Sequence, residues 1–270
     1  MKPQPSLSTI KSLIIDMDGV LWRGNALLPG FKPLFDFLRR RRISFTLASN
    51  NSSRTQRQYA QKFAGFGVTI SPQQVMTSSL ATAEYLKTVY PPGTGVYVIG
   101  QDGIRQALTA AGFAIAEEGA AAVVVGLDFE LTYAKLKTAT VLINNGAAFI
   151  GTNPDRTFPF EGGIAPGNGA ILAAISAATG QQPTVIGKPG RAMFTVALNR
   201  MGTGPGHTAM LGDRLETDIL GGRQAGLKTI LVLSGVTRPE DLAHSDLQPD
   251  WVFTGIDALL EAWQKSEGEL

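Results

Sequence analysis

The stretch SLIIDMDG, residues 12–19, decides how the rest of the chain is interpreted. Its first four residues form a short, mostly apolar run with two β-branched side chains, which predicts a buried strand over residues 12–15. Two carboxylates, Asp16 and Asp18, follow this strand directly. Ligands of parallel α/β sheets bind beyond the carboxyl ends of the strands. Residues that follow the other strands are therefore the first candidates for a functional site.

Apolar runs of strand length recur along the chain and alternate with helical patterns. Further strands are predicted at residues 43–48, 95–99, 121–125, 148–151, 184–186, 208–211 and 229–233. Helices are predicted at residues 31–40, 54–66, 132–145 and 193–201. This alternation predicts an α/β fold built on doubly wound parallel sheets that helices cover on both faces.

The composition excludes several kinds of site. Of the 270 residues, 44% are hydrophobic and 17% are charged, as in an ordinary globular chain. The absence of cysteine excludes disulfides, thiolate zinc sites, iron–sulfur clusters and a cysteine nucleophile. A net charge of +2 is too small a surplus to indicate a nucleic-acid partner. Any attraction for an anion must therefore come from a local site.

The chain offers no segment for a membrane. It has no run of 18 or more apolar residues, and residues 1–19 lack the apolar segment and cleavage site of an export signal. We therefore expect no membrane partner and a cytoplasmic location.

Polar residues suited to phosphate chemistry follow four of the predicted strands. They are Asp16 and Asp18 after residues 12–15, Ser49 and Asn50 after residues 43–48, Lys188 after residues 184–186, and Asp213 with Asp218 after residues 208–211. Each signal alone has an ordinary explanation as a turn, a helix cap or a surface lysine. Their conjunction at strand ends favours a site, since the ends of parallel strands can meet at one edge of a sheet.

Several close carboxylates repel one another unless one is protonated or a cation is present. A hard divalent cation such as Mg²⁺ relieves this repulsion, because Mg²⁺ prefers oxygen ligands. The ammonium group of Lys188 and the hydroxyl group of Ser49 suit the phosphoryl oxygens that need stabilisation in a transition state. The residues thus predict a Mg²⁺ cofactor and a phosphate-ester ligand.

These residues resemble the motifs of the haloacid dehalogenase-like (HAD) phosphatase superfamily. The similarity extends to subfamily IIA, which contains the NagD-like proteins, the 4-nitrophenyl phosphatases and the phosphoglycolate and pyridoxal-phosphate phosphatases. The matching stretches are DMDGVLWRGNALLPG at 16–30, LASNNSS at 47–53, TNPD at 152–155, PGNGA at 166–170, GKP at 187–189 and GDRLETD at 212–218. Because they span nearly the whole chain, the resemblance is specific to the subfamily.

The resemblance implies a catalytic role for each motif residue. Asp16 would be the nucleophile that forms an aspartyl-phosphate, and Asp18 would protonate the leaving group and then activate water. Ser49 and the backbone of Asn50 would hold the transferring phosphate, and Lys188 would neutralise Asp16 and the phosphoryl oxygens.

The metal site follows from the same resemblance. Mg²⁺ would be bound by Asp16, by the backbone carbonyl of Asp18 and by Asp213, with Asp218 close by. Gly19 is expected beside the phosphate. The implied activity is that of a phosphoric monoester hydrolase acting on small metabolites such as a sugar phosphate, a nucleoside monophosphate or an aryl phosphate such as 4-nitrophenyl phosphate.

The resemblance also implies a Rossmann-like core with an inserted, smaller α/β cap domain. The core would comprise residues 1–79 and 183–270, and the cap residues 80–182, in the position between the second and third motifs. The cap would close over the site and select the substrate. A homodimer through the cap is a further expectation.

The loop from Asn153 to residue 163 is the candidate for substrate contact within the cap. Its polar residues Asn153, Asp155, Arg156 and Glu161 are the candidates for substrate specificity, although Asn-Pro-Asp is also an ordinary turn former. Trp22, just after the first motif, is a further candidate. It can line the entrance to the pocket or anchor a hairpin, and the sequence does not decide between the two.

Other functions compete with a phosphomonoesterase. Asp18 argues against a dehalogenase and the cap position argues against a phosphomutase. A phospho-accepting regulatory domain also combines an aspartate, Mg²⁺ and a lysine on a doubly wound sheet, but the long insertion and the pair Asp213 and Asp218 argue against it. A protein that binds phosphate esters without turnover stays an alternative that a measurement of turnover decides.

Overall fold

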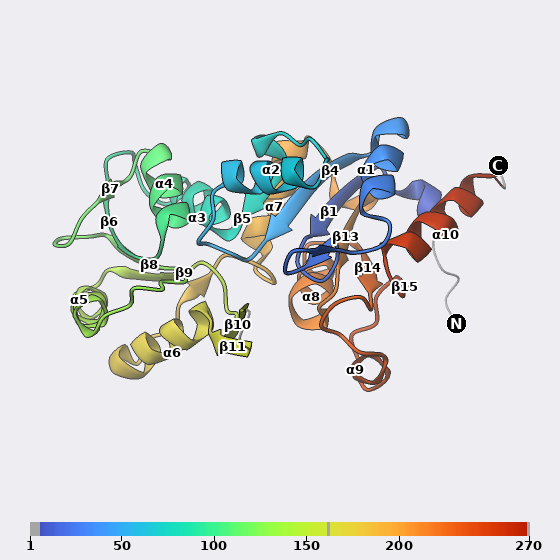
Figure 1. The fold of residues 1–270 in the computed structure, drawn as a ribbon. Helices are drawn as coiled ribbons and strands as arrows, with labels where there is room; N and C mark the ends of the chain where they lie inside the picture. The colour runs from blue at the N-terminus through green and yellow to red at the C-terminus, as the bar shows by residue number, and fades with distance from the viewer. Residues whose placement is uncertain (1–5, 161–162, 269–270) are drawn as a thin grey trace. The chain divides into compact units, whose positions relative to one another are not determined.

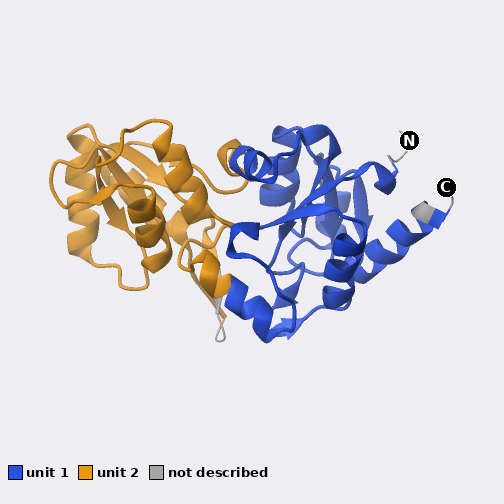
Figure 2. Ribbon diagram, turned by 90° about the horizontal axis from the view of Figure 1, so that it is seen from above, with its two compact units in different colours: residues 1–49, 60–75, 194–270 blue, residues 50–59, 76–193 orange. Residues whose placement is uncertain are grey.

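The computed structural model describes residues 6–160 and 163–268 (Figure 1). The chain divides into two compact units, coloured separately in Figure 2. Unit 1 comprises Met1–Ser49, Ala60–Val75 and Phe194–Leu270, and unit 2 comprises Asn50–Tyr59 and Met76–Met193. The predicted cap, residues 80–182, falls within unit 2, and its exact boundaries stay a prediction.

A six-stranded sheet with the order β15-β14-β13-β1-β4-β5 forms the centre of unit 1. The pairs β15–β14, β14–β13, β13–β1 and β1–β4 are all parallel. The strand bounds are β1 Ser12–Asp16, β4 Ser44–Ser49, β5 Val75–Thr77, β13 Thr208–Gly212, β14 Lys228–Val232 and β15 Trp251–Phe253. Consecutive residues of β1, β4, β13 and β14 are buried, so both faces of the sheet are covered, as expected for a doubly wound fold.

The helices that lie wholly in unit 1 are α1 Phe31–Arg40, α8 Leu220–Gln224, α9 Pro239–Ala243 and α10 Ile256–Gly268, with single turns at Leu7–Thr9, Pro72–Gln74 and Pro205–His207. Helices α2 Gln56–Gly65 and α7 Arg191–Met201 begin in unit 2 and end in unit 1. Helix α1 packs on α10 through the rings of Phe37 and Trp263, whose centroids are 5.5 Å apart. Apolar residues of α1 recur at helical spacing, which puts Phe31, Leu34 and Leu38 on its buried side.

The strand order of this sheet reverses next to β1. From β1 the chain continues to β4 and β5 on one side, whereas β13, β14 and β15 extend the sheet on the other. Such a switch point leaves a crevice beyond the carboxyl ends of the two strands that flank it. Residues that follow β1 and β13 are therefore placed to bind a ligand.

Unit 2 has its own five-stranded sheet with the order β12-β9-β8-β6-β7, all in parallel pairs. Its strands are β6 Gly95–Ile99, β7 Ala114–Ile115, β8 Ala122–Val125, β9 Ala148–Gly151 and β12 Thr184–Val185. Helices α5 Tyr133–Asn144 and α6 Asn168–Thr179 cover one face, and α3 Ser78–Lys87 and α4 Asp102–Ala110 lie on the other (Figure 1). Val123, Val125, Ile143 and Leu172 belong to the apolar core beneath α5 and α6.

Two short antiparallel hairpins complete the fold. Strands β2 Trp22–Arg23 and β3 Ala26–Leu27 pair directly after the first motif. Strands β10 Thr157–Phe160 and β11 Gly163–Pro166 pair within unit 2. The second hairpin occupies much of the segment expected as the substrate loop, so that segment is only partly irregular. None of the described helices is long and apolar enough to cross a membrane.

Candidate active site

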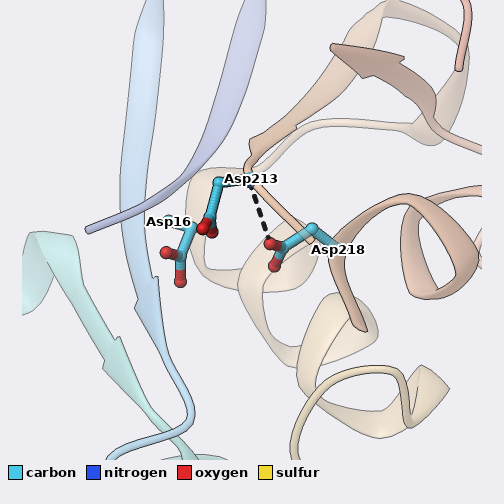
Figure 3. A group of neighbouring side chains, drawn as sticks. All are labelled: Asp16, Asp213 and Asp218. Carbon is cyan, nitrogen blue, oxygen red and sulfur yellow. Dashed lines mark hydrogen bonds between the residues drawn. The ribbon is translucent and has the colours of Figure 1, made fainter. Parts of the chain in front are cut away.

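Three carboxylates of unit 1 converge beyond β1 and β13, the strands that flank the switch point (Figure 3). Asp16 is the last residue of β1, Asp213 follows β13, and Asp218 lies in a π-helical segment, Leu215–Ile219. One oxygen atom of each side chain lies within 4.8 Å of the other two. The structure thus brings together three of the acidic residues that the sequence singled out.

Backbone amides hold two of these carboxylates in place. Oδ2 of Asp218 accepts the N–H groups of Asp213, at 3.2 Å, and of Arg214, at 3.1 Å. Oδ2 of Asp213 accepts the N–H group of Val236 at 2.7 Å. Both side chains are buried. These N–H dipoles offset part of the negative charge and fix the direction of each carboxylate before any cation binds.

The donor set fits a hard divalent cation. The three candidate ligands are carboxylates, two of them buried, and the sequence has no cysteine to offer a soft donor. Oxygen-only donors favour Mg²⁺, Ca²⁺ or Mn²⁺ over Zn²⁺ or Cu²⁺. Three like charges at this spacing also repel strongly in a buried setting, and a cation removes that repulsion.

Glycine is required where the backbone passes these carboxylates. Gly19 has a φ of +90°, and a Cβ there would lie 2.5 Å from Oδ2 of Asp213. At Gly212 a Cβ would collide with the carboxylate of Asp218. Gly19 therefore lies against the acidic group, at the turn that follows the first motif.

Replacement of Gly19 by Ala should disable the metal site. The new methyl group must displace the carboxylate of Asp213, in addition to the strain of a positive φ, which costs about 1–2 kcal/mol. Gly24→Ala is a matched control, because Gly24 also has a positive φ (+59°) but no atom within 4 Å of its Cβ position. We expect Gly19→Ala to lose more stability than Gly24→Ala in thermal denaturation, because of the added collision, and only Gly19→Ala to need much more Mg²⁺ for activity. Equal Mg²⁺ requirements would contradict the collision with Asp213.

Two further residues that the sequence singled out lie near the end of β1 along the chain or in the sheet. Ser49 is on the neighbouring strand β4, and Asp18 is in the turn that follows β1. Ser49 is the buried last residue of β4, one residue beyond Ala48, which is level with Asp16 in the parallel β1–β4 ladder. Asp18 is exposed, and its Oδ1 accepts the indole N–H of Trp22 at 2.8 Å.

In unit 2 the side chain of Asn50 clamps the backbone of Lys188. Oδ1 of Asn50 accepts the N–H of Lys188 at 2.8 Å, and Nδ2 donates to the carbonyl oxygen of Lys188 at 2.9 Å. The same Nδ2 donates to Oδ1 of Asp155 at 3.2 Å. Lys188 is buried. The amide of Asn50 therefore fixes the position of the third motif by a pair of hydrogen bonds that no aliphatic side chain could make.

The side-chain amide of Asn153 links the TNPD segment, residues 152–155, to the backbone of Asn50. Nδ2 of Asn153 donates to the carbonyl oxygen of Asn50 at 2.7 Å, and its Oδ1 accepts the N–H of Asp155 at 3.2 Å. Nδ2 of Asn168 in turn donates to the carbonyl oxygen of Asn153 at 2.8 Å. These bonds define the turn, so the geometry favours a structural role for Asn153.

The remaining specificity candidates differ in their surroundings. Arg156 is exposed and Asp155 is partly buried. Glu161 lies outside the described residues. Trp22 is completely buried and packs among other aromatic rings, as an anchor of the β2–β3 hairpin does.

The strand before Lys188 lies in a different sheet from the strands before Asp16, Ser49 and Asp213. The sequence left open that all four strands share one sheet edge. Instead β12 pairs with β9 in the sheet of unit 2, whereas β1, β4 and β13 are neighbours in the sheet of unit 1. Strand β12 has only two residues, and neither is fully buried. A strand this short has no hydrophobic pattern that would assign it to one sheet or the other.

Comparison with known proteins agrees with this arrangement. The model of the haloacid dehalogenase-like hydrolases matches residues 13–114, and a second, HAD-hydrolase-like model matches residues 185–259. An acid sugar phosphatase of Staphylococcus epidermidis is 38% identical over 256 residues, which cover 94% of this chain and 98% of that protein. The chain belongs to the haloacid dehalogenase-like (HAD) hydrolases.

Solved structures of HAD phosphatases are similar over nearly the whole fold. The 4-nitrophenylphosphatase of Thermotoga maritima superposes with a TM-score of 0.91 at 36% identity, covering 96% of this chain and 99% of its own. The glycerol phosphate phosphatase of Mycobacterium tuberculosis, solved in complex with magnesium, gives a TM-score of 0.88 at 30% identity, with 98% and 80% covered. These likenesses confirm the HAD fold and the relation to the subfamily IIA phosphatases that the motifs indicate.

Proposed function

We propose that this HAD phosphatase is a Mg²⁺-dependent phosphomonoester hydrolase that acts through an aspartyl-phosphate on Asp16. The observation that carries the proposal is the group of Asp16, Asp213 and Asp218 at the switch point, with one oxygen atom of each within 4.8 Å of the others. The family membership and the magnesium complex of the mycobacterial relative support it.

The first half-reaction transfers the phosphoryl group to the enzyme. A carboxylate oxygen of Asp16 forms a bond to phosphorus while the ester P–O bond breaks. Asp18 gives its proton to the departing oxygen, so the product leaves as an alcohol. Ser49, the backbone of Asn50 and Gly19 are assigned to the phosphoryl oxygens, and Lys188 is assigned the compensating positive charge.

In the second half-reaction Asp18, now ionised, takes a proton from water. The oxygen of that water bonds to phosphorus, the Asp16–phosphorus bond breaks, and inorganic phosphate leaves. Bound Mg²⁺ would be held by Asp16, Asp213 and the carbonyl of Asp18, near Asp218, and would lower the repulsion between the nucleophile and a dianionic ester.

The proposed substrates are small phosphorylated metabolites, such as a sugar phosphate, a nucleoside monophosphate or an aryl phosphate. The relatives are named for acid sugar, 4-nitrophenyl and glycerol phosphates, which supports a range of small esters. Asp155, Arg156 and Glu161 remain the proposed specificity residues. A cytoplasmic location and a homodimer through the cap, both expected from the sequence, complete the proposal.

Phosphate release from 4-nitrophenyl phosphate, with Mg²⁺ and after chelation, tests the proposal. We expect turnover that chelation removes and added Mg²⁺ restores. A folded protein that releases no phosphate from this ester or from a panel of natural esters would instead be a binding protein. Turnover that is unaffected by chelation would contradict the metal requirement.

A further inference from the structure

The turn after the first motif brings Trp22 back beside Asp18. The N–H of Leu21 donates to the carbonyl oxygen of Met17 at 2.8 Å, and the N–H of Gly19 donates to that of Trp22 at 2.8 Å. Residue 22 then begins the β2–β3 hairpin. Four positions apart in the sequence, Asp18 and Trp22 form a bridge and become neighbours.

Packing fixes the direction of the Trp22 ring. No part of the side chain is exposed, and its ring lies 5.1 Å from Phe63 in an edge-to-face contact and 5.8 Å from Phe66. Nζ of Lys62 lies 4.1 Å from the centre of the ring and donates to the carbonyl oxygen of Gly24 at 3.2 Å. These contacts hold the ring and the hairpin together, so the indole N–H points in one direction.

That N–H donates to Oδ1 of Asp18 at 2.8 Å. Asp18 itself is exposed, and an exposed carboxyl group that lacked such a bond would exchange between rotamers. An indole N–H can only donate, so Oδ1 must be an acceptor in every protonation state. In the neutral acid the carbonyl oxygen is the better acceptor, so this bond favours Oδ1 as the carbonyl oxygen and Oδ2 as the atom that carries the proton.

We propose that Trp22 is the positioning residue of Asp18: its indole N–H holds Oδ1 so that Oδ2 delivers the proton to the leaving group. This assignment rests on the proposed function, in which Asp18 is the general acid. It gives Trp22 a role in the reaction beyond anchoring the hairpin, and a role different from substrate selection.

The dependence of kcat/KM on the leaving group tests the assignment. Phenyl phosphate and 4-nitrophenyl phosphate have similar shapes, but phenolate leaves less readily and depends more on a general acid, whose contribution is about 10²–10⁴-fold. Trp22→Phe keeps an aromatic ring and removes the N–H. We expect kcat/KM to fall about 10-fold for phenyl phosphate, which is a part of the whole general-acid contribution. For 4-nitrophenyl phosphate we expect a fall of about 2-fold or less, because its leaving group needs little help from an acid.

Two further variants separate positioning from packing. Phe66→Leu removes one contact to the ring but keeps the N–H donor, so its loss of kcat/KM should differ less between the two esters than that of Trp22→Phe. In an Asp18→Asn background, Trp22→Phe should add little, because the two residues act as one unit. Equal losses for the two esters in Trp22→Phe would overturn the assignment.

The single variant Asp18→Asn separates a failure of the positioning role of Trp22 from a failure of the proposed function. If Asp18→Asn discriminates between the esters and Trp22→Phe does not, the positioning role of Trp22 fails and the proposed function stands. If Asp18→Asn does not discriminate, the proposed role of Asp18 itself fails. If the wild type hydrolyses neither of these esters nor any of the natural esters, the proposed function fails.

Discussion

Asp16→Asn should abolish turnover of 4-nitrophenyl phosphate while leaving the fold intact. Asn has nearly the shape of Asp but is a far weaker nucleophile, and it also removes one charge from the acidic group. Loss of the nucleophile in hydrolases that form covalent intermediates costs on the order of 10⁴–10⁶-fold in kcat. Phosphate release measures this loss, and circular dichroism shows whether the fold persists.

The thermal stability of Asp16→Asn gives an independent check, because stability is not expected to fall although activity is lost. The side chains of Asp16, Asp213 and Asp218 repel one another in the metal-free protein, so removal of one charge should stabilise it or leave it unchanged. Added Mg²⁺ should raise the melting temperature of the wild type and have little effect on Asp16→Asn. Activity comparable to that of the wild type would reject Asp16 as the nucleophile, whatever the melting temperatures.

Asp213→Asn should remove most of the affinity for Mg²⁺. The new amide can still accept the N–H of Val236 through its oxygen, so the local turn is preserved, but a charged ligand of the buried acidic group is lost. Changes that only surround a metal ligand cost about 10–100-fold in affinity or activity, and loss of a ligand should cost at least that much. Titration with Mg²⁺, followed by activity and by calorimetry with the metal alone, measures the change.

Asp128→Asn is the matched control for this prediction. Asp128 is also buried, but it lies in unit 2, where its Oδ2 pairs with Nζ of Lys135 at 2.8 Å. Its replacement should lower the stability of the protein, because it breaks a mostly buried ion pair, and leave the Mg²⁺ requirement unchanged. A similar change in Mg²⁺ requirement for both variants would mean that Asp213 acts through stability and not as a ligand.

Long, strongly apolar strands were predictable from the sequence. The predictions at 95–99 and 148–151 agree with β6 and β9 at both ends, and those for β1, β4, β13 and β14 differ by one residue at one or both ends. Continuous apolar runs of this kind are characteristic of strands buried on both faces, and the side chains after them mark the sheet edge. The group of Asp16, Asp213 and Asp218 followed from that rule.

Shorter elements carried too little pattern. Strands β5, β7 and β15 have two or three residues each, which is too few to establish an alternation. The β10–β11 hairpin contains prolines and glycine, which favoured a loop. The π-helical turn that carries Asp218 and the contact between Asp18 and Trp22 depend on tertiary packing, for which the sequence has no local signal.

The position of β1 has a consequence for the exchange of amide hydrogens with solvent. This strand lies inside the sheet, paired on one side with β13 and on the other with β4, and residues 12–15 are all buried. Amides in such a place exchange only when the whole unit unfolds, whereas hairpins and loops open far more often. The carboxylate of Asp16, the proposed nucleophile, therefore stands at the end of the segment that opens last.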